Sequence, residues 1–318
     1  MNGDQPKIEI FEPFGAALEL MKRILFQPFD FTKWLVLGFA AFLSGSWGSN
    51  FRFNFPLNRN WNFRSISHHN MPTSESLPLW LLPFIVVLAI LVLILIFVLM
   101  WVTSRGRFIF TDCVVKNRAA IVAPWREYRR EGNSFFLFSL AVTFLAIAIV
   151  AALALLIAVP LGLFAGGKGT AGLGATAVFA FVFVGLVWLA FVIFFAVVSQ
   201  FMVPVMYRRR CLAREAFFDV SKLVLARPSP FVLFVLFGIV LVMALILVST
   251  IVSCLTCCLA GLPYISSVVL LPAFVWLLAF KLLFLRQFGP EYDVWAIVNP
   301  PVPASPAGPA SMPPSPAE

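Results

Sequence analysis

Four long apolar runs constrain the fold of this chain more than any other feature. They cover residues 77–102, 135–159, 173–205 and 231–255, and each exceeds the roughly 18 apolar residues that mark a candidate transmembrane helix. Hydrophobic residues make up 61% of the chain and charged residues 12%, against about 45–50% and about 25% in a soluble domain. The sequence therefore predicts an integral membrane protein.

Two weaker runs complete the predicted bundle. The run at 264–285 is interrupted only by Lys281, which we expect to extend to the inner interface. The run at 31–45 is short, and it follows a polar, acid-containing segment rather than the short basic leader of a signal peptide. We interpret it as an uncleaved span, which gives an all-α fold class: a polytopic bundle of six transmembrane helices.

The distribution of basic residues predicts the orientation. Of the 23 Lys and Arg residues, 19 fall on the side of both termini, and the other four are Arg52, Arg59, Arg64 and Lys168. Cytosolic segments carry the excess of Lys and Arg, so we expect a multi-pass protein of a bacterial inner membrane with both termini in the cytosol. The formal charge of +9 is then a signal of orientation and of attraction to anionic headgroups, and we expect no nucleic-acid partner.

Two segments outside the spans carry a helical apolar stripe. The stripe residues are Phe14, Ala17, Leu18, Met21, Ile24 and Leu25 in the first, and Ala213, Ala216, Phe217, Val220, Leu223 and Val224 in the second. This spacing forms one face of an α-helix, and Pro28 and Pro228 end the two helices. We predict amphipathic helices at the inner membrane surface, with the stripe in lipid or against the bundle. The alternative is that basic loops are periodic by chance.

A looser third copy follows in "AAIVAPWREYRREGNSFFLF". Its apolar positions are Ala120, Ile121, Pro124 and Tyr128, and Gly132 takes the place of the helix breaker. The sequence thus predicts three repeats, each with a cytosolic surface helix, a break and a two-helix hairpin.

The predicted domains follow from these repeats. We divide the chain into a cytosolic N-terminal segment at 1–28, a membrane domain at 29–298 with an outer loop at 46–76, and a disordered Pro-rich tail at 299–318.

Two motifs that suggest catalysis or nucleotide binding have plainer interpretations. The string "GLFAGGK" at 162–168 fits a phosphate loop, but it follows a membrane helix and Gly169 stands where Ser or Thr must reach magnesium. We interpret it as a flexible turn. His68 and His69 are the only histidines, and they lie in the polar outer loop without visible partners. We expect no enzyme activity, no cofactor and no metal.

The cysteines near 254–258 leave three interpretations open. Cys254, Cys257 and Cys258 share one helical face. They are small apolar helix residues, or Cys254 and Cys257 form a disulfide on the outer side, or the group binds a metal, although a tetrahedral site requires four ligands.

Three blocks of sequence resemble a known group of proteins. The blocks are "ILFQPFDFTKWLVLGFAAFL", "MVPVMYRRRCLAREAFFDVSKLVLARP" and "CLTCCLAGLPYISSVVLLPAFVWLLAFKLLFLRQFGPEYDVW". They look like a family of uncharacterised bacterial six-span membrane proteins, similar in layout to the membrane domain attached to some glycerophosphodiester phosphodiesterases. The resemblance implies a helical bundle in a bacterial inner membrane. The catalytic domain of those phosphodiesterases has no counterpart here.

These observations lead to one functional expectation and one alternative. We expect a non-enzymatic protein that binds anionic lipids, or serves as a scaffold for a protein partner or a second copy of itself, through its basic cytosolic helices. The contact residues we predict are Arg126, Arg129, Arg130, Arg208, Arg209, Arg210, Arg214 and Lys222. The alternative is a transporter or channel for a neutral or apolar solute, because no span carries a charge at mid-membrane.

Overall fold

The computed structural model describes residues 9, 11–45, 81–164, 171–255 and 263–298. Within these ranges the chain is helical, with no strand. The predicted outer loop, the glycine-rich turn and the C-terminal tail lie outside the described residues. The all-α fold class is confirmed for the part of the chain that the structure describes.

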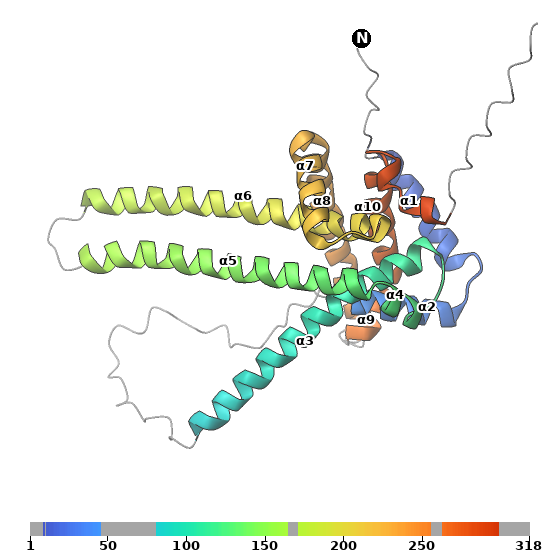
Figure 1. Ribbon diagram of the computed structural model, residues 1–318, viewed down its shortest axis with the longest axis horizontal. Coiled ribbons are helices and arrows are strands. Elements are labelled where there is room, and N and C mark those ends of the chain that lie inside the picture. The colour runs from blue at the N-terminus through green and yellow to red at the C-terminus, as the bar shows by residue number, and fades with distance from the viewer. Residues whose placement is uncertain (1–8, 10, 46–80, 165–170, 256–262, 299–318) are drawn as a thin grey trace, which may run out of the picture.

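Each of the four long apolar runs forms one long helix. These helices are α3 (Leu81–Val115), α5 (Arg129–Phe164), α6 (Ala171–Arg209) and α8 (Pro228–Leu255). All four are long and apolar enough to cross a membrane. The first three have 35 to 39 residues, or more than about 50 Å at 1.5 Å per residue, so they exceed a hydrocarbon layer of about 30 Å. Their surplus length builds a compact body at one end (Figure 1).

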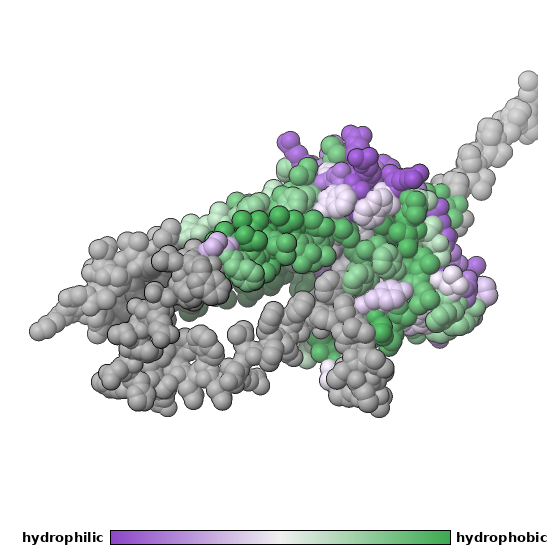
Figure 2. Space-filling view, turned by 90° about the horizontal axis from the view of Figure 1, so that it is seen from below, coloured by the Kyte–Doolittle hydropathy of each residue, from purple (hydrophilic) through white to green (hydrophobic). Residues whose placement is uncertain are grey.

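The compact body holds the buried core. It contains the C-terminal ends of α3 and α6 and the N-terminal ends of α5 and α8. It also contains the shorter helices α1 (Phe11–Phe26), α2 (Phe31–Leu43), α4 (Val122–Glu127), α7 (Ala213–Ala226), α9 (Pro263–Val269) and α10 (Leu271–Arg286). Figure 2 shows hydrophobic residues along the projecting helices and hydrophilic residues gathered at the compact end. The body is therefore the polar end of an otherwise apolar molecule.

Helices α1 and α7 cover the segments with the predicted apolar stripes. Ala17, Met21 and Ile24 of α1 are buried, as are Ala216 and Val220 of α7. Helix α1 packs along α10, and α7 packs against α6. Both helices end before the expected prolines. The stripes thus pack against the protein, which is one of the two environments predicted for them.

The third predicted surface helix is much shorter than its counterparts. Helix α4 has only six residues, and the chain turns at Tyr128 before α5 begins at Arg129. The prediction of a helix breaker at Gly132 is wrong, because Gly132 lies inside α5. A side chain there would approach Cγ of Arg105 to 2.9 Å, so this glycine allows α5 to pack closely against α3.

The two weaker apolar runs do not form long helices. Helix α2 has 13 residues, about 20 Å, and lies beside α3 and α9. The run at 264–285 is divided between α9 and α10 near Leu270. Helix α10 is packed along α1, which carries Glu12, Glu19, Lys22 and Arg23. The described helices thus provide four candidate spans, and the number six stays a prediction.

Candidate functional site

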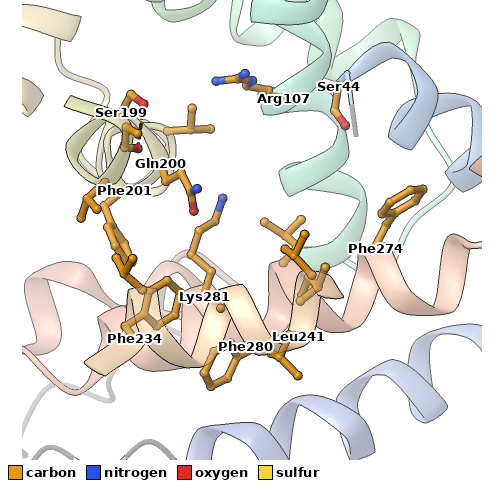
Figure 3. A pocket seen from close by; sticks show the side chains of 18 of the residues that line it. Ser44, Arg107, Ser199, Gln200, Phe201, Phe234, Leu241, Phe274, Phe280 and Lys281 are labelled. Carbon is orange, nitrogen blue, oxygen red and sulfur yellow. Dashed lines mark hydrogen bonds between the residues drawn. The ribbon is translucent and has the colours of Figure 1, made fainter. Parts of the chain in front are cut away.

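A cavity of about 770 Å³ lies where the long helices enter the compact body (Figure 3). It is lined by Ser44 and Gly45, which follow α2, and by residues of α3, α6, α8 and α10. On α10 the lining residues are Phe274, Leu277, Leu278, Phe280 and Lys281, and all but Phe280 have the spacing of one helical face. On α3 they are Arg107, Phe110 and Thr111. We call this space the groove.

The walls of the groove run along α6 and α8 toward the membrane-spanning parts of these helices. On α6 they cover 193–203, and on α8 they cover 234–245, each about 15 Å long at 1.5 Å per residue. The wall residues Ile193, Ile239 and Met243 are also among the exposed large hydrophobic residues. The groove is therefore continuous with the surface that would face lipid chains.

Phenylalanines close the opposite end of the groove. The ring of Phe201 on α6 packs on Phe231 and Phe234 of α8, with centroids 5.3 and 5.2 Å apart. Phe284 of α10 joins them, with its centroid 4.6 Å from that of Phe234. Phe280 stacks on Phe234 at 5.2 Å. These rings connect α6, α8 and α10 at the compact end and separate the groove from the surface beyond.

Two cations face this apolar space. Arg107 and Lys281 line the groove from α3 and α10, and Figure 3 shows both side chains directed into it, with Lys281 beside Gln200. Neither cation has a carboxylate within salt-bridge distance among the described residues, and the guanidinium of Arg107 lies 5.4 Å from the ring centroid of Phe135. The two charges also lie close enough to repel one another. Arg107 is exposed and Lys281 half-buried, and the lining around them is largely apolar. The pair is therefore accessible to an anionic group, and where lipid replaces water beside it a counter-anion would offset the cost of the two charges.

Close packing of α2 against α3 sets the position of Arg107. Its neighbour Gly106 lies against the C-terminal end of α2, where an added Cβ would overlap the carbonyl group of Leu43 and reach the amide nitrogen of Ser44 at 2.7 Å. Only glycine allows this approach. Arg107 is therefore held beside the end of α2, whose Ser44 and Gly45 also line the groove.

A buried carboxylate fixes the other face of α3. Asp112 is fully buried and accepts hydrogen bonds from Tyr207 Oη of α6 at 3.0 Å and from Nε and Nη2 of Arg118 at 2.9 and 2.6 Å. Lys116 forms a salt bridge with it at 2.7 Å. The hydrogen bond to Asp112 also raises the pKa of Arg118. This cluster joins α3 to α6 and thus keeps two walls of the groove in register.

The other arginine on α3 has a different environment. Arg105 is buried, donates to Oδ1 of Asn133 at 3.1 and 2.8 Å, and lies over the rings of Trp101 and Trp125 at 4.3 and 5.1 Å. Cation–π contacts and the amide oxygen satisfy this guanidinium without an anion. The comparison with Arg107 shows that an unpaired cation is a feature of the groove and not of α3 as a whole.

The basic residues predicted as contacts are only partly free. Arg209 binds Asp219 at 2.7 Å and Glu291 at 2.6 Å. Arg210 pairs with Glu127 and lies 3.8 Å from the ring centroid of Tyr128, whose pKa burial raises, so that the ring stays neutral. Arg208 is half-buried, and its Nε has no hydrogen-bond partner among the described residues. The structure thus removes Arg209 and Arg210 from the group of unpaired surface cations.

The remaining predicted contact residues lie on the surface of the compact body. The exposed ones are Arg126, Arg129, Arg130, Arg214 and Lys222. They belong to α4, to the start of α5 and to α7, and the structure does not bring them together with the groove. Cys257 and the side chain of Cys254 lie outside the described part of the chain, so the disulfide stays a prediction.

The sequence alone did not single out the two residues of the groove as a site. In the sequence, Arg107 is one of the basic residues that indicate orientation, and Lys281 is expected to extend to the inner interface. A signal was present in α10, where Lys281 is seven residues after Phe274, on the face of an otherwise apolar helix. The sequence holds no comparable signal that distinguishes Arg107 from Arg105. The two arginines are only two positions apart on α3, yet Arg107 faces the groove and Arg105 lies against two tryptophan rings.

Taken together, the described residues define an all-helical protein with four apolar helices of membrane-spanning length. A family model matches residues 8–297, and the chain belongs to this family, the family of unknown function DUF7544. No curated protein and no solved structure matches the chain. The likeness in layout to the membrane domain of some glycerophosphodiester phosphodiesterases stays a prediction.

Proposed function

We propose that the protein binds an anionic membrane lipid in the groove and does not alter it chemically. One observation carries this proposal: Arg107 and Lys281, without counter-anions among the described residues, face an apolar groove that continues onto the exposed surface of α6 and α8. An anionic head between the two cations and acyl chains along the apolar walls would match both parts of the groove.

The lining of the groove distinguishes this function from the alternatives. Its residues include no carboxylate, histidine or cysteine among those the structure describes. The hydroxyls of Ser44, Thr111 and Ser199 donate to backbone carbonyls, an arrangement that favours binding over catalysis. A neutral or apolar solute would leave both cations without a partner, which disfavours a pathway for such solutes through this groove.

The orientation of the site follows from the basic residues. We place both termini and the compact body on the cytosolic side of the cell membrane, because Lys and Arg are concentrated there. The phenylalanine-closed end of the groove then faces the cytosol, and its walls run into the inner leaflet. A lipid would enter sideways from that leaflet, between α6 and α8.

Native mass spectrometry of the full-length protein, extracted with its surrounding membrane, tests the proposal. The double variant Arg107→Gln/Lys281→Gln removes the two charges of the groove, and Arg126→Gln/Arg130→Gln removes two exposed charges as a matched control. We expect bound anionic lipid to fall at least fivefold in the groove variant and to stay unchanged in the control. Equal retention in both variants would contradict a site in the groove.

The opposite result would favour the surface helices. If lipid were lost from the control and retained by the groove variant, binding would depend on the exposed arginines instead. Loss of a stoichiometric protein partner or of a dimer from the control would support the scaffold role. The same spectra report lipid, partner and oligomeric state, so one experiment separates these outcomes.

A further inference from the structure

We infer that the anionic group recognised by the groove is a lipid phosphomonoester, a headgroup that ends in a bare phosphate. This inference rests on the proposed function and specifies its ligand. It is based on the number of unpaired charges, the hydrogen-bond donors that remain free, and the lack of a partner for a larger head.

The number of charges favours a dianion. Arg107 and Lys281 together supply two positive charges, and the described residues that line the groove supply no negative charge. A phosphodiester head carries one negative charge and would leave one of the two cations, of which Arg107 is exposed and Lys281 half-buried, without a counter-charge. A phosphomonoester carries between about −1.5 and −2 at pH 7 and would neutralise the pair.

The hydrogen-bond donors point to the same group. The hydroxyl of Ser44 donates to the carbonyl of Ala41 at 2.7 Å, that of Thr111 to Arg107 at 2.8 Å, and that of Ser199 to Ala196 at 2.9 Å. These three donors are thus engaged by backbone carbonyls three or four residues before them in the chain.

The donors left for a ligand are few and compact. They are the guanidinium of Arg107, the ammonium of Lys281 and the side-chain amide of Gln200, which has no hydrogen-bond partner among the described residues. Three donor groups at one end of an apolar groove match the three terminal oxygens of a phosphomonoester.

The lining also disfavours larger heads. A zwitterionic head bears an ammonium group, and the described lining has no carboxylate to receive it. A sugar or polyol head requires several polar partners, whereas the lining beyond the residues already named is almost entirely aliphatic and aromatic. A bare phosphate requires only the donors that are present.

The inference carries a pH dependence. The second pKa of a phosphomonoester is about 6, so the head gains negative charge as the pH rises from 5.5 to 7.5. Among the described residues, the titratable or charged groups that face the head are Arg107 from α3 and Lys281 from α10, and α2, α6 and α8 present none to it. Binding should therefore strengthen with pH over this interval. A phosphodiester stays a monoanion throughout and should show no such increase.

The test uses the full-length protein in neutral-lipid nanodiscs with two probes of identical acyl chains, phosphatidate and phosphatidylglycerol. We expect about a tenfold preference for phosphatidate at pH 7.5, and a preference of threefold or less at pH 5.5. Lys281→Gln leaves one positive charge, and it should remove the preference while binding of phosphatidylglycerol persists. The variant Arg130→Gln, which changes an exposed charge outside the groove, should retain the preference.

The outcomes separate this inference from the proposed function. Equal binding of the two lipids at pH 7.5, with loss of both in Arg107→Gln/Lys281→Gln, would contradict the inference of a phosphomonoester but support lipid binding in the groove. Binding of neither lipid would contradict both the inference and the proposed function. Competition by inorganic phosphate at concentrations similar to the lipid would show that the groove recognises a free phosphate, and would overturn the lipid source.

Discussion

The hydroxyl of Tyr207 donates to Oδ1 of Asp112 at 3.0 Å, and this contact joins the buried ends of α6 and α3. The two residues are 95 positions apart in the chain. Tyr128 stacks on Tyr207 with centroids 4.9 Å apart, which brings the turn between α4 and α5 to the same point. The segment between α3 and α5 and the end of α6 are thus fixed through one carboxylate, beside the walls of the groove.

Removal of the charge on Asp112 should destabilise the compact body. Asp112→Asn would leave Lys116 and Arg118 with Glu127, at 3.6 Å from each, as their remaining shared acidic partner. We expect the free energy of unfolding to fall by about 2 kcal/mol, because hydrogen bonds to a buried charged group are strong. Tyr207→Phe removes one hydrogen bond and should cost about 1 kcal/mol.

Unfolding of the purified protein in a mild detergent measures these effects. Asp219→Asn is the matched control, because its salt bridge with Arg209 is partly exposed and should contribute less than about 1 kcal/mol. An effect of Asp112→Asn no larger than that of Asp219→Asn would show that the buried cluster does not stabilise the fold.

A single methyl group should disturb the contact of α2 with α3. In Gly106→Ala the new Cβ overlaps the backbone at the end of α2, and backbone cannot move aside as a side chain can, so we expect a loss of about 2 kcal/mol or more. Gly185→Ala on α6 is the control, because no atom lies within 4 Å of its added Cβ. Thermal unfolding that is the same for the two variants would contradict the close packing described here.

The groove can be blocked without any change of charge. Gly238 of α8 lines it, and an added Cβ would meet no atom within 4 Å. Gly238→Leu should therefore fold normally and fill space along the apolar wall, so that bound lipid falls severalfold while Arg107 and Lys281 remain. Gly185→Leu places the same side chain on α6 outside the groove and should have no effect. Undiminished lipid in Gly238→Leu would argue against acyl chains along α8.

Neutralisation of the paired arginines should affect lipid binding little. Arg209 and Arg210 already have acidic partners, so Arg209→Gln/Arg210→Gln is expected to retain bound anionic lipid. Each lost surface pair should lower stability by less than about 1 kcal/mol. Lipid content and unfolding can be measured on one preparation. A large loss of lipid with unchanged stability would show that lipid binding depends on Arg209 and Arg210 and not on the groove alone.

Reporter fusions test the topology. We expect an external signal at Asn60 and Lys168 and a cytosolic signal at Glu127 and at the C-terminus, as the distribution of basic residues indicates. A cytosolic signal at Asn60 would show that the run at 31–45 does not cross, in agreement with the short length of α2.

The sequence determined the four apolar helices of membrane-spanning length and the positions of the two striped helices α1 and α7. Continuous apolar runs and stripes at helical spacing are local properties of the sequence. Protein packing and lipid both remove such apolar surfaces from water, so the helices form wherever the segments lie in the fold. The prediction for the third repeat places the helix break at Gly132, whereas the chain turns at Tyr128. The position of a break depends on how closely the neighbouring helix packs, and this is not a local property of the sequence. Gly132 permits contact with Arg105 and does not end a helix.

Only the tertiary structure decided which charges are paired. Four arginines have different partners in the structure. Arg105 contacts a tryptophan ring and an asparagine amide, and Arg209 and Arg210 form salt bridges with acidic residues. Arg107 faces the groove with Lys281. Electrostatic pairing acts over a few ångströms in space. Residues 107 and 281 meet only because α3 and α10 pack around one groove, so the sequence defined the membrane protein and the fold defined its candidate site.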